Sequence, residues 1–383
     1  MLISTVRWLE LLVIGVFVFD LTHSPFQVAL MLILRMLPLA LFGAISAGVA
    51  DKIGQRYLLL LSLAVMVVVS IVTAVLVTLS LIEMWHLALA SFVGGVFWCT
   101  DYPTRRMLLG DIAGTERIGT AMSLDAITNN GTRMLGPLLG GSLLAVLGLD
   151  GAFYLGAVLY LIAIGAIAKL PVDVGAASDN RDSVITNVLE GLRYLKKDTN
   201  LTSLLAVTVI FNLWGFPFLS MIPVIGRDVH DLGSFAVGVL ASCEGVGALV
   251  GALLIATFAT ARHFRRLYLG GLAIYLVLIV VFAQAPTPYI AAGAMLVVGL
   301  GGAAFSAMQS TLIYLNAPPA MRSRMMGVLS VCIGTGPIGF AHVGLLATYL
   351  DAPTAVAIIG IEGAIALVLV CVAWPRLLSK VAT

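Results

Sequence analysis

Several charged or polar residues of this sequence lie inside long apolar stretches, where they could carry protons or bind a solute. Asp125, Asn129 and Arg133 recur every four residues, so in a helix they form one polar stripe. Glu244 lies in the middle of another apolar stretch. An ionisable side chain costs at least ~2.5–3.5 kcal/mol at the centre of a bilayer unless it is paired or hydrated. If these stretches cross a membrane, the residues indicate a functional site.

Arg35 is a further candidate, and Glu10 and Asp20 could supply its counter-charge from the first apolar stretch. For Arg35 and Arg133 there is an equally good alternative, an internal ion pair that stabilises one half of the molecule. Because arginine does not release its proton, either residue could instead orient a carboxylate or bind an anionic group.

Carboxylates are better candidates than arginines for carrying protons, because removal from water makes a carboxylate bind a proton more readily. Glu244 is the first candidate and Asp125 the second, since neither has a basic residue within four positions on its own helix. Glu10 is the third. His342 and Glu362 lie in the last two apolar stretches, but a single histidine in a helix is more often a hydrogen-bonded packing residue.

The composition favours a chain whose solvent is lipid. Hydrophobic residues make up 61% of the 383 residues and charged residues 10%. About 20 apolar residues span a bilayer as a helix, and only helices of this length satisfy their own backbone groups there. Twelve predicted helices follow: 1–20, 25–50, 57–80, 84–103, 118–147, 152–170, 201–224, 235–260, 267–284, 287–314, 325–349 and 353–375.

The basic residues predict the orientation of these helices. Seventeen of the 21 Lys and Arg residues fall after even-numbered helices, including the C-terminus, and only Arg227 falls in a connection on the other side. The positive-inside rule places the basic side in the cytoplasm, so we expect a multi-pass protein of the cell inner membrane. The dispersal of the basic residues over many loops argues against a nucleic-acid partner.

No sequence motif indicates an enzyme. The four cysteines are far apart within apolar stretches, which fits neither a metal site nor a disulfide framework. GxxxxGK[ST], HExxH and GxSxG patterns are absent. We therefore expect no catalytic residues, metal or cofactor, and no direct use of ATP.

One long connection, 171–200, separates the two halves. It carries a polar stretch and then apolar residues at helical spacing, which predicts a linker and an amphipathic helix on the cytoplasmic membrane surface. The expected domains are residues 1–170, the linker 171–200, and residues 201–383. Gly136-Pro137 and Gly336-Pro337 recur 200 positions apart. Two related bundles suggest alternating access to a site between them.

Short motifs carry a resemblance to a known family. The segment from Ala47 to Arg56 resembles the loop signature of the major facilitator superfamily, and Gly136-Pro137-Leu138-Leu139-Gly140-Gly141 resembles its helix-5 antiporter signature. Four further stretches look like the branch of the enterobactin exporter and the macrolide-type drug:proton antiporters. They are Asp20 to Pro25, Arg35 to Pro38, Pro103 to Arg106 and Glu190 to Tyr194.

The resemblance implies a fold of twelve helices in two six-helix bundles. It also implies a gate at Asp51, Lys52, Gly54 and Arg56, which closes the cytoplasmic side by holding Asp51 against the N-terminus of the eleventh helix. Gly54 tolerates a positive φ there. The second signature, Gly136, Pro137, Gly140 and Gly141, thins the fifth helix for a close neighbour and implies export rather than uptake.

The sequence departs from the family pattern at three points. Ala47 replaces the first glycine of the loop signature, and the helix-4 arginine of many drug:proton antiporters has no match between Leu87 and Gly95. Met1 also falls within the expected first helix, which predicts that this helix is truncated at its N-terminus or that the reading frame starts upstream.

The sequence therefore predicts a secondary active transporter that exports small amphipathic molecules, drugs or siderophores, in exchange for protons. Its expected partners are the solute, protons and the lipid bilayer, and we expect a monomer. A uniporter or importer of an unknown solute is one alternative. A scaffold or permease subunit that transports nothing by itself is the other.

Overall fold

The computed structural model describes residues 1–169 and 184–378. Within these ranges it describes no side chain for residues 43–53, 184–187, 320 and 323 and for several residues between 102 and 123. The described part is helical and contains no strand. The prediction of an all-helical protein is therefore confirmed.

The first half of the chain forms five long helices. They are α1 (Leu2–Thr22), α2 (Pro25–Ile53), α3 (Gln55–Thr78), α4 (Met84–Val146) and α5 (Gly148–Ala168). Apolar sequences of 18 residues or more in all of them but α4 explain why helices rather than strands form in lipid.

Helix α4 has 63 residues and is two helices joined at Gly114, whose φ of 65° and ψ of 175° are not helical. The two arms correspond to the predicted helices 84–103 and 118–147. The prediction of a loop between them was wrong for most of its length, because helical structure continues through Arg105, Arg106 and Arg117. A positive φ at glycine carries little steric cost, so the chain reverses at this residue.

The second half contains α6 and six further spans. Its helices are α6 (Val184–Leu195), α7 (Thr199–Ile210), α8 (Ile222–Val224), α9 (Ser234–Phe258), α10 (Phe264–Ala283), α11 (Pro288–Asn316), α12 (Arg322–Ile333), α13 (Gly336–Tyr349) and α14 (Ala352–Ala373).

Two spans of this half are interrupted. The span Thr199–Val229 passes from α7 through the π-helical turn η1 (Phe211–Gly215) and the 3₁₀ turn η2 (Phe216–Met221) to α8 and η3 (Ile225–Val229). Pro217 and Pro223 lack the amide hydrogen that a continuous α-helix needs. The predicted helix 325–349 is likewise divided into α12 and α13, with Pro337 in the first turn of α13.

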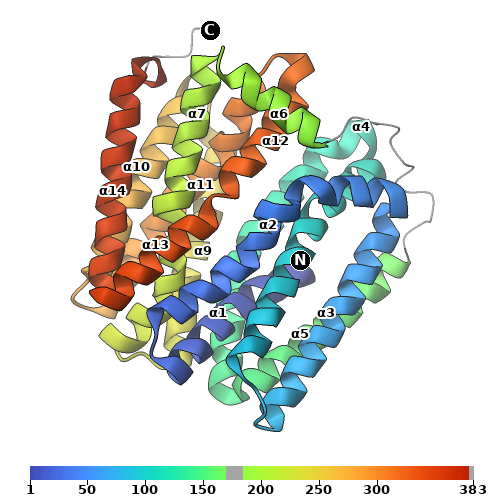
Figure 1. Cartoon of the computed structure of the whole chain (residues 1–383), viewed down its shortest axis with the longest axis vertical. Coiled ribbons are helices and arrows are strands. Elements are labelled where there is room, and N and C mark those ends of the chain that lie inside the picture. The colour runs from blue at the N-terminus through green and yellow to red at the C-terminus, as the bar shows by residue number, and fades with distance from the viewer. Residues whose placement is uncertain (170–183, 379–383) are drawn as a thin grey trace.

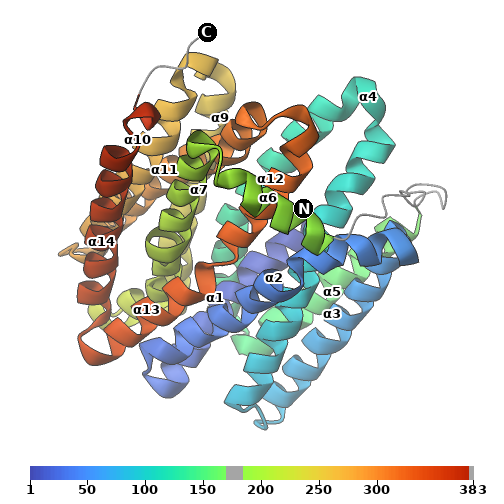
Figure 2. The same cartoon turned by 45° about the horizontal axis from the view of Figure 1, so that its top comes forward.

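Ten helical segments of the described residues are long and apolar enough to cross a membrane. The two arms of α4 complete the twelve spans of the predicted fold. Figures 1 and 2 show two bundles, one containing α1 to α5 and the other α7 to α14. The predicted domain limits at 170 and 200 remain a prediction, because residues 170–183 lie outside the described part.

The most extensive contacts between the bundles are those of α4 with α9 and of α2 with α13. A Cβ placed on Gly141 of α4 would lie 2.8 Å from Gly238 Cα of α9, and one on Gly344 of α13 would lie 2.8 Å from Ala29 Cβ of α2. All four residues lie toward the membrane face opposite the basic loops. Helix α6 crosses the other face beside α12 (Figure 1).

Candidate transport site between the two bundles

Arg133 and Glu244 form an ion pair that joins the two halves of the molecule. Arg133 lies on the second arm of α4 and Glu244 on α9, and Arg133 Nη2 donates to Glu244 Oε1 at 2.5 Å. The carboxylate side chain is 4% exposed. A Cβ on Gly245 would lie 2.4 Å from the backbone nitrogen of Met134, so the two helices touch backbone to backbone here. The pair therefore lies at the contact between the bundles.

A largely apolar pocket opens beside this pair. Besides Arg133 and Glu244, its lining includes Trp8, Leu32, Met36, Pro137, Phe216 and Ala241, which come from both bundles. The guanidinium of Arg133 lies 5.1 Å from the centre of the Trp8 ring, a distance at which a cation attracts an aromatic face. The arrangement offers an apolar body and one charged end to a solute.

A second pocket between the bundles lies next to the first along α2 and η2. Its lining includes Met36, Trp98, Phe211, Asn212, Phe216 and Gln309. Three aromatic residues, Trp98, Phe211 and Phe216, line this pocket, whereas Trp214 lines a different one.

Arg35 and Glu10 pair within the first bundle. Arg35 Nη2 donates to Glu10 Oε2 at 3.1 Å, and the Tyr160 hydroxyl donates to Glu10 Oε1 at 3.3 Å. Both charged side chains are at most 4% exposed. The expected counter-charge is thus Glu10. Asp20 does not serve Arg35, because it pairs with Arg227 of the other bundle at the rim of the molecule.

Asp125 has two basic partners, although no basic residue lies within four positions of it in the sequence. The reversal at Gly114 brings the first arm of α4 beside the second, so Asp125 pairs with both Arg105 and Arg106. Asp101, one turn before Arg105, also pairs with Arg7 of α1 at 3.4 Å.

The polar stripe of α4 is therefore shared between different partners. Asp125 pairs within the first bundle and Arg133 pairs with the second. The backbone carbonyl of Asn129, between them, accepts a hydrogen bond from Thr132. Glu244 also has a basic partner, which lies on another helix and not within four positions on its own.

The glycines of the helix-5 signature lie at close helix contacts. A Cβ on Gly136 would lie 2.4 Å from Trp8 Cβ, and one on Gly140 would lie 3.1 Å from the Leu9 carbonyl oxygen, both on α1. Gly141 meets α9 of the other bundle. The helix continues through Pro137.

The predicted gate is only partly described. Gly54 has φ 91° and precedes α3, as a residue with a positive φ was expected to do. Arg56 donates to the Ala168 carbonyl oxygen at the end of α5. The side chains of Asp51 and Lys52 lie outside the described residues, so their part in a gate stays a prediction.

Sequence reasoning missed three members of the buried networks: Arg7, Asp101 and Tyr160. Arg7 was detectable, because it interrupts the first apolar stretch as Arg35 interrupts the second. Asp101 was hidden by its position at the predicted end of a helix, beside a presumed loop.

Comparisons with known proteins agree with this architecture. A family model described as transmembrane secretion effector matches residues 2–380. The chain is 27% identical over 209 residues to the uncharacterised MFS-type transporter YfiS of Bacillus subtilis, a match that covers 53% of this chain and 49% of YfiS. It is 20% identical over 257 residues to the staphyloferrin A transporter of Staphylococcus aureus, covering 65% and 63%. It is 24% identical over 324 residues to the multidrug efflux pump Tap of Mycolicibacterium fortuitum, covering 81% and 78%. The chain thus spans about half the length of the first of these relatives.

Solved transporters share the fold. The nucleoside transporter NupG superimposes with a TM-score of 0.71 at 14% identity, covering 97% of this chain and 96% of NupG. A bacterial homologue of the human lysosomal transporter Spinster, in an inward-facing and occupied conformation, gives a TM-score of 0.74 at 14% identity, covering 98% and 94%. These identities establish the fold alone. With the family match over almost the whole chain, they show that this protein belongs to the transmembrane secretion effector family, a group of major facilitator superfamily transporters.

Proposed function

We propose that this protein exports small amphipathic molecules from the cytoplasm in exchange for protons, and that the Arg133–Glu244 pair couples the two movements. The observation that carries this proposal is the position of the pair: it links the two bundles and lines the pocket between them. A solute that enters this pocket meets the same carboxylate that would take up a proton.

The orientation follows from the basic loops. With these loops in the cytoplasm of a bacterial cell, the close glycine contacts of α4 with α9 and of α2 with α13 lie toward the outer side, which favours an inward-facing state. In this state Glu244 is ionised and paired with Arg133. The pair helps to hold the outer side closed.

Exchange then follows from the three alternative partners of the Glu244 carboxylate. It can hold Arg133, a proton or the polar end of a solute. A solute that displaces Arg133 weakens the contact between the bundles, and the outer side opens. After the solute leaves, a proton neutralises the carboxylate for the return, and its release to the cytoplasm restores the pair.

The proton gradient supplies enough energy for such a cycle. One elementary charge that moves through ~150 mV releases ~3.5 kcal/mol, since 100 mV correspond to ~2.3 kcal/mol. At ~1.4 kcal/mol per factor of ten, this sustains a solute gradient of roughly 300-fold. One titratable carboxylate is therefore sufficient.

The apolar lining supports an amphipathic solute. Trp8, Met36 and Phe216 offer contact area without fixed hydrogen-bond geometry, which suits a range of shapes. Two relatives, the multidrug efflux pump Tap and the staphyloferrin A transporter, favour the same class of cargo.

Proton movement in proteoliposomes tests this proposal. Comparing the drug susceptibility and siderophore secretion of deletion and complemented cells first identifies a solute. A pH-sensitive dye in the lumen then reports whether that solute drives proton movement. We expect substrate-dependent proton movement with the native chain and none with Glu244→Gln, which keeps the size of the side chain and removes its charge.

Glu83→Gln is the matched control, because Glu83 is a carboxylate outside the apolar spans, at the N-terminus of α4. It should behave as the native chain does. Solute flux that ignores the pH gradient would exclude antiport and support a uniporter or importer. The absence of flux for every solute tested, in liposomes that contain folded protein, would favour a scaffold.

A further inference from the structure

A third pocket, here called the outer pocket, lies on the outside of the C-terminal bundle, away from the contact between the halves. It also contains ionisable residues. Its lining comprises Leu213, Trp214, Ile338, Gly339, His342 and Glu362, from the α7 span, α13 and α14. Helix α14 lies at the edge of the molecule in Figures 1 and 2. Ile338 on α13 and Ile361 on α14 are 65% and 52% exposed, so this surface faces lipid in a membrane.

One carboxylate is the centre of this pocket. Glu362 Oε2 lies 2.8 Å from His342 Nε2 and accepts a hydrogen bond from Trp214 Nε1 at 2.9 Å. Among the described contacts, Glu362 Oε1 has no hydrogen-bond partner. The side chains of Glu362 and His342 are 40% and 41% exposed. A carboxylate oxygen is therefore open to the lipid side.

The pocket lies deep in the membrane. Glu362 is ten residues from Ala352 and eleven from Ala373, the ends of α14. At ~1.5 Å per residue it is therefore about 15 Å from either end. A charged group at this depth is costly and usually marks a function. The headgroups of phospholipids stay at the membrane surface, so they do not reach it.

Close helix packing holds these side chains in place. A Cβ on Gly339 of α13 would lie 2.4 Å from the Leu213 carbonyl oxygen, and one on Gly363 of α14 would lie 2.8 Å from Trp214 Cβ. The three elements thus meet at backbone distance directly beside the polar groups. The close approach at Gly339 and Gly363 therefore fixes the positions of Trp214, His342 and Glu362 relative to one another.

We propose that this pocket binds lipophilic cations from the bilayer. Its described lining residues include the carboxylate of Glu362 and no Lys or Arg, which favours a positive ligand. The depth requires that the charge be carried by an apolar body. The Trp214 indole offers an aromatic surface to such a cation in addition to the carboxylate.

The outer pocket is also adjacent to the second of the two pockets between the bundles, the one lined by Trp98 and Gln309. Phe211, Asn212 and Gly336 line the pocket between the bundles, whereas Leu213, Trp214 and Ile338 line the outer pocket. The same two elements, η1 and the start of α13, therefore separate the pockets, and both spans are interrupted there. A cation bound at Glu362 therefore lies next to η1 and the start of α13, where the α-helices of both spans are interrupted. The binding of a cation at this site does not depend on the proposed function. Only the idea that the bound cation is then transported rests on it.

Photolabelling with an azidophenyl-triphenylphosphonium cation tests the site in lipid nanodiscs without any transport step. We expect mass spectrometry of the labelled protein to find adducts in residues 336–366, at a level at least about tenfold lower in Glu362→Gln, since ~1.4 kcal/mol of charge attraction corresponds to that factor. Glutamine keeps the acceptor for Trp214 and removes the charge. Glu362→Asp should retain most of the labelling.

Two controls separate this inference from the proposed function. Glu244→Gln should label the 336–366 region as the native chain does, although it loses proton coupling. The uncharged azidophenyl-triphenylmethane should label this region weakly. Equal labelling of the native chain and folded Glu362→Gln, or equal labelling by the neutral compound, would overturn the site. If Glu362→Gln does not fold, competition by unlabelled tetraphenylphosphonium decides instead: failure to compete contradicts the site, and competition supports it.

Discussion

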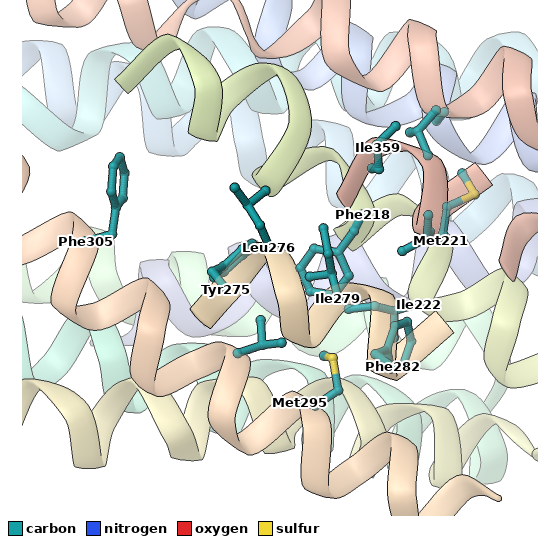
Figure 3. Packing of buried hydrophobic residues seen from close by; sticks show 14 of the residues in the cluster. Phe218, Met221, Ile222, Tyr275, Leu276, Ile279, Phe282, Met295, Phe305 and Ile359 are labelled. Carbon is teal, nitrogen blue, oxygen red and sulfur yellow. The ribbon is translucent and has the colours of Figure 1, made fainter. Parts of the chain in front are cut away.

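The two bundles stabilise their interiors by different means. In the first bundle, buried charges link the helices: Arg7 with Asp101 and Arg35 with Glu10. In the second bundle, aromatic rings pack together between η1, α10 and α11. Phe305 stacks on Phe211 at 4.3 Å and on Tyr268 at 4.9 Å between ring centres, and Figure 3 shows the neighbouring apolar side chains.

This difference suggests a division of labour. A satisfied network of buried charges has few alternative arrangements, so it favours one geometry of α1, α2 and α4. Apolar contacts are less directional, and the interrupted spans, α7 to η3 and α12 to α13, are all in the second bundle. We therefore expect the first bundle to move as a rigid unit and the second to bend.

The largest effect should follow from breaking a charge pair in the first bundle. Glu10→Leu leaves Arg35 buried without its partner and should lower the free energy of unfolding by about 3–5 kcal/mol. Replacing both residues, Glu10→Leu with Arg35→Met, should recover most of this loss. Denaturant unfolding in detergent measures both variants, and a double variant as unstable as the single one would contradict the account of the pair.

A smaller loss is expected in the aromatic interior of the second bundle. Phe305→Leu removes ring stacking from a side chain that is 1% exposed and should cost about 1–2 kcal/mol. Because apolar neighbours can repack, the variant should remain transport-competent. Loss of transport without loss of stability would show that this bundle is as rigid as the other.

The predicted gate should affect the balance of states more than stability. Asp51→Asn removes a charge expected at the N-terminus of the eleventh helix, an interaction worth ~0.3–2 kcal/mol. The equilibrium should shift several-fold toward the state that is open at the basic loops. Cysteine accessibility on that face measures the shift, with Lys197→Gln as the control, an exposed basic residue on the same side that is not part of the predicted gate. Unchanged labelling and unchanged transport would argue against the gate.

Breaking the rim pair Asp20–Arg227 should shift the equilibrium in the opposite direction from Asp51→Asn, toward the state that is open on the face away from the basic loops. The pair joins the bundles on that face, and its side chains are 41% and 24% exposed, so Asp20→Asn should cost less than ~1 kcal/mol of stability. Opening on that face should become more frequent. If cysteine labelling on that face is no higher in Asp20→Asn than in the native chain, the pair does not help to keep that face closed.

Sequence reasoning located the spans well, because the length of an apolar stretch follows directly from bilayer thickness. It failed where partners are far apart in the chain. Arg133 and Glu244 are 111 positions apart, and nothing in either helix indicates the other. The pairing of Asp125 with Arg105 depends on the reversal at Gly114, a position that looked like part of an ordinary loop. The networks are therefore products of tertiary packing.

The central claim is that the pair of ionised Glu244 with Arg133 holds the outer contact between the bundles closed, so that the chain with a neutral side chain at this position can adopt both states. Spin labels at Leu81 and Tyr289, both exposed and one in each bundle, report this opening by double electron–electron resonance in a chain without its four cysteines. We expect long distances to gain population as the pH falls from mildly alkaline to mildly acidic, and to be populated at every pH in Glu244→Gln. Distances in the variant that match the native chain and respond to pH in the same way would contradict the claim.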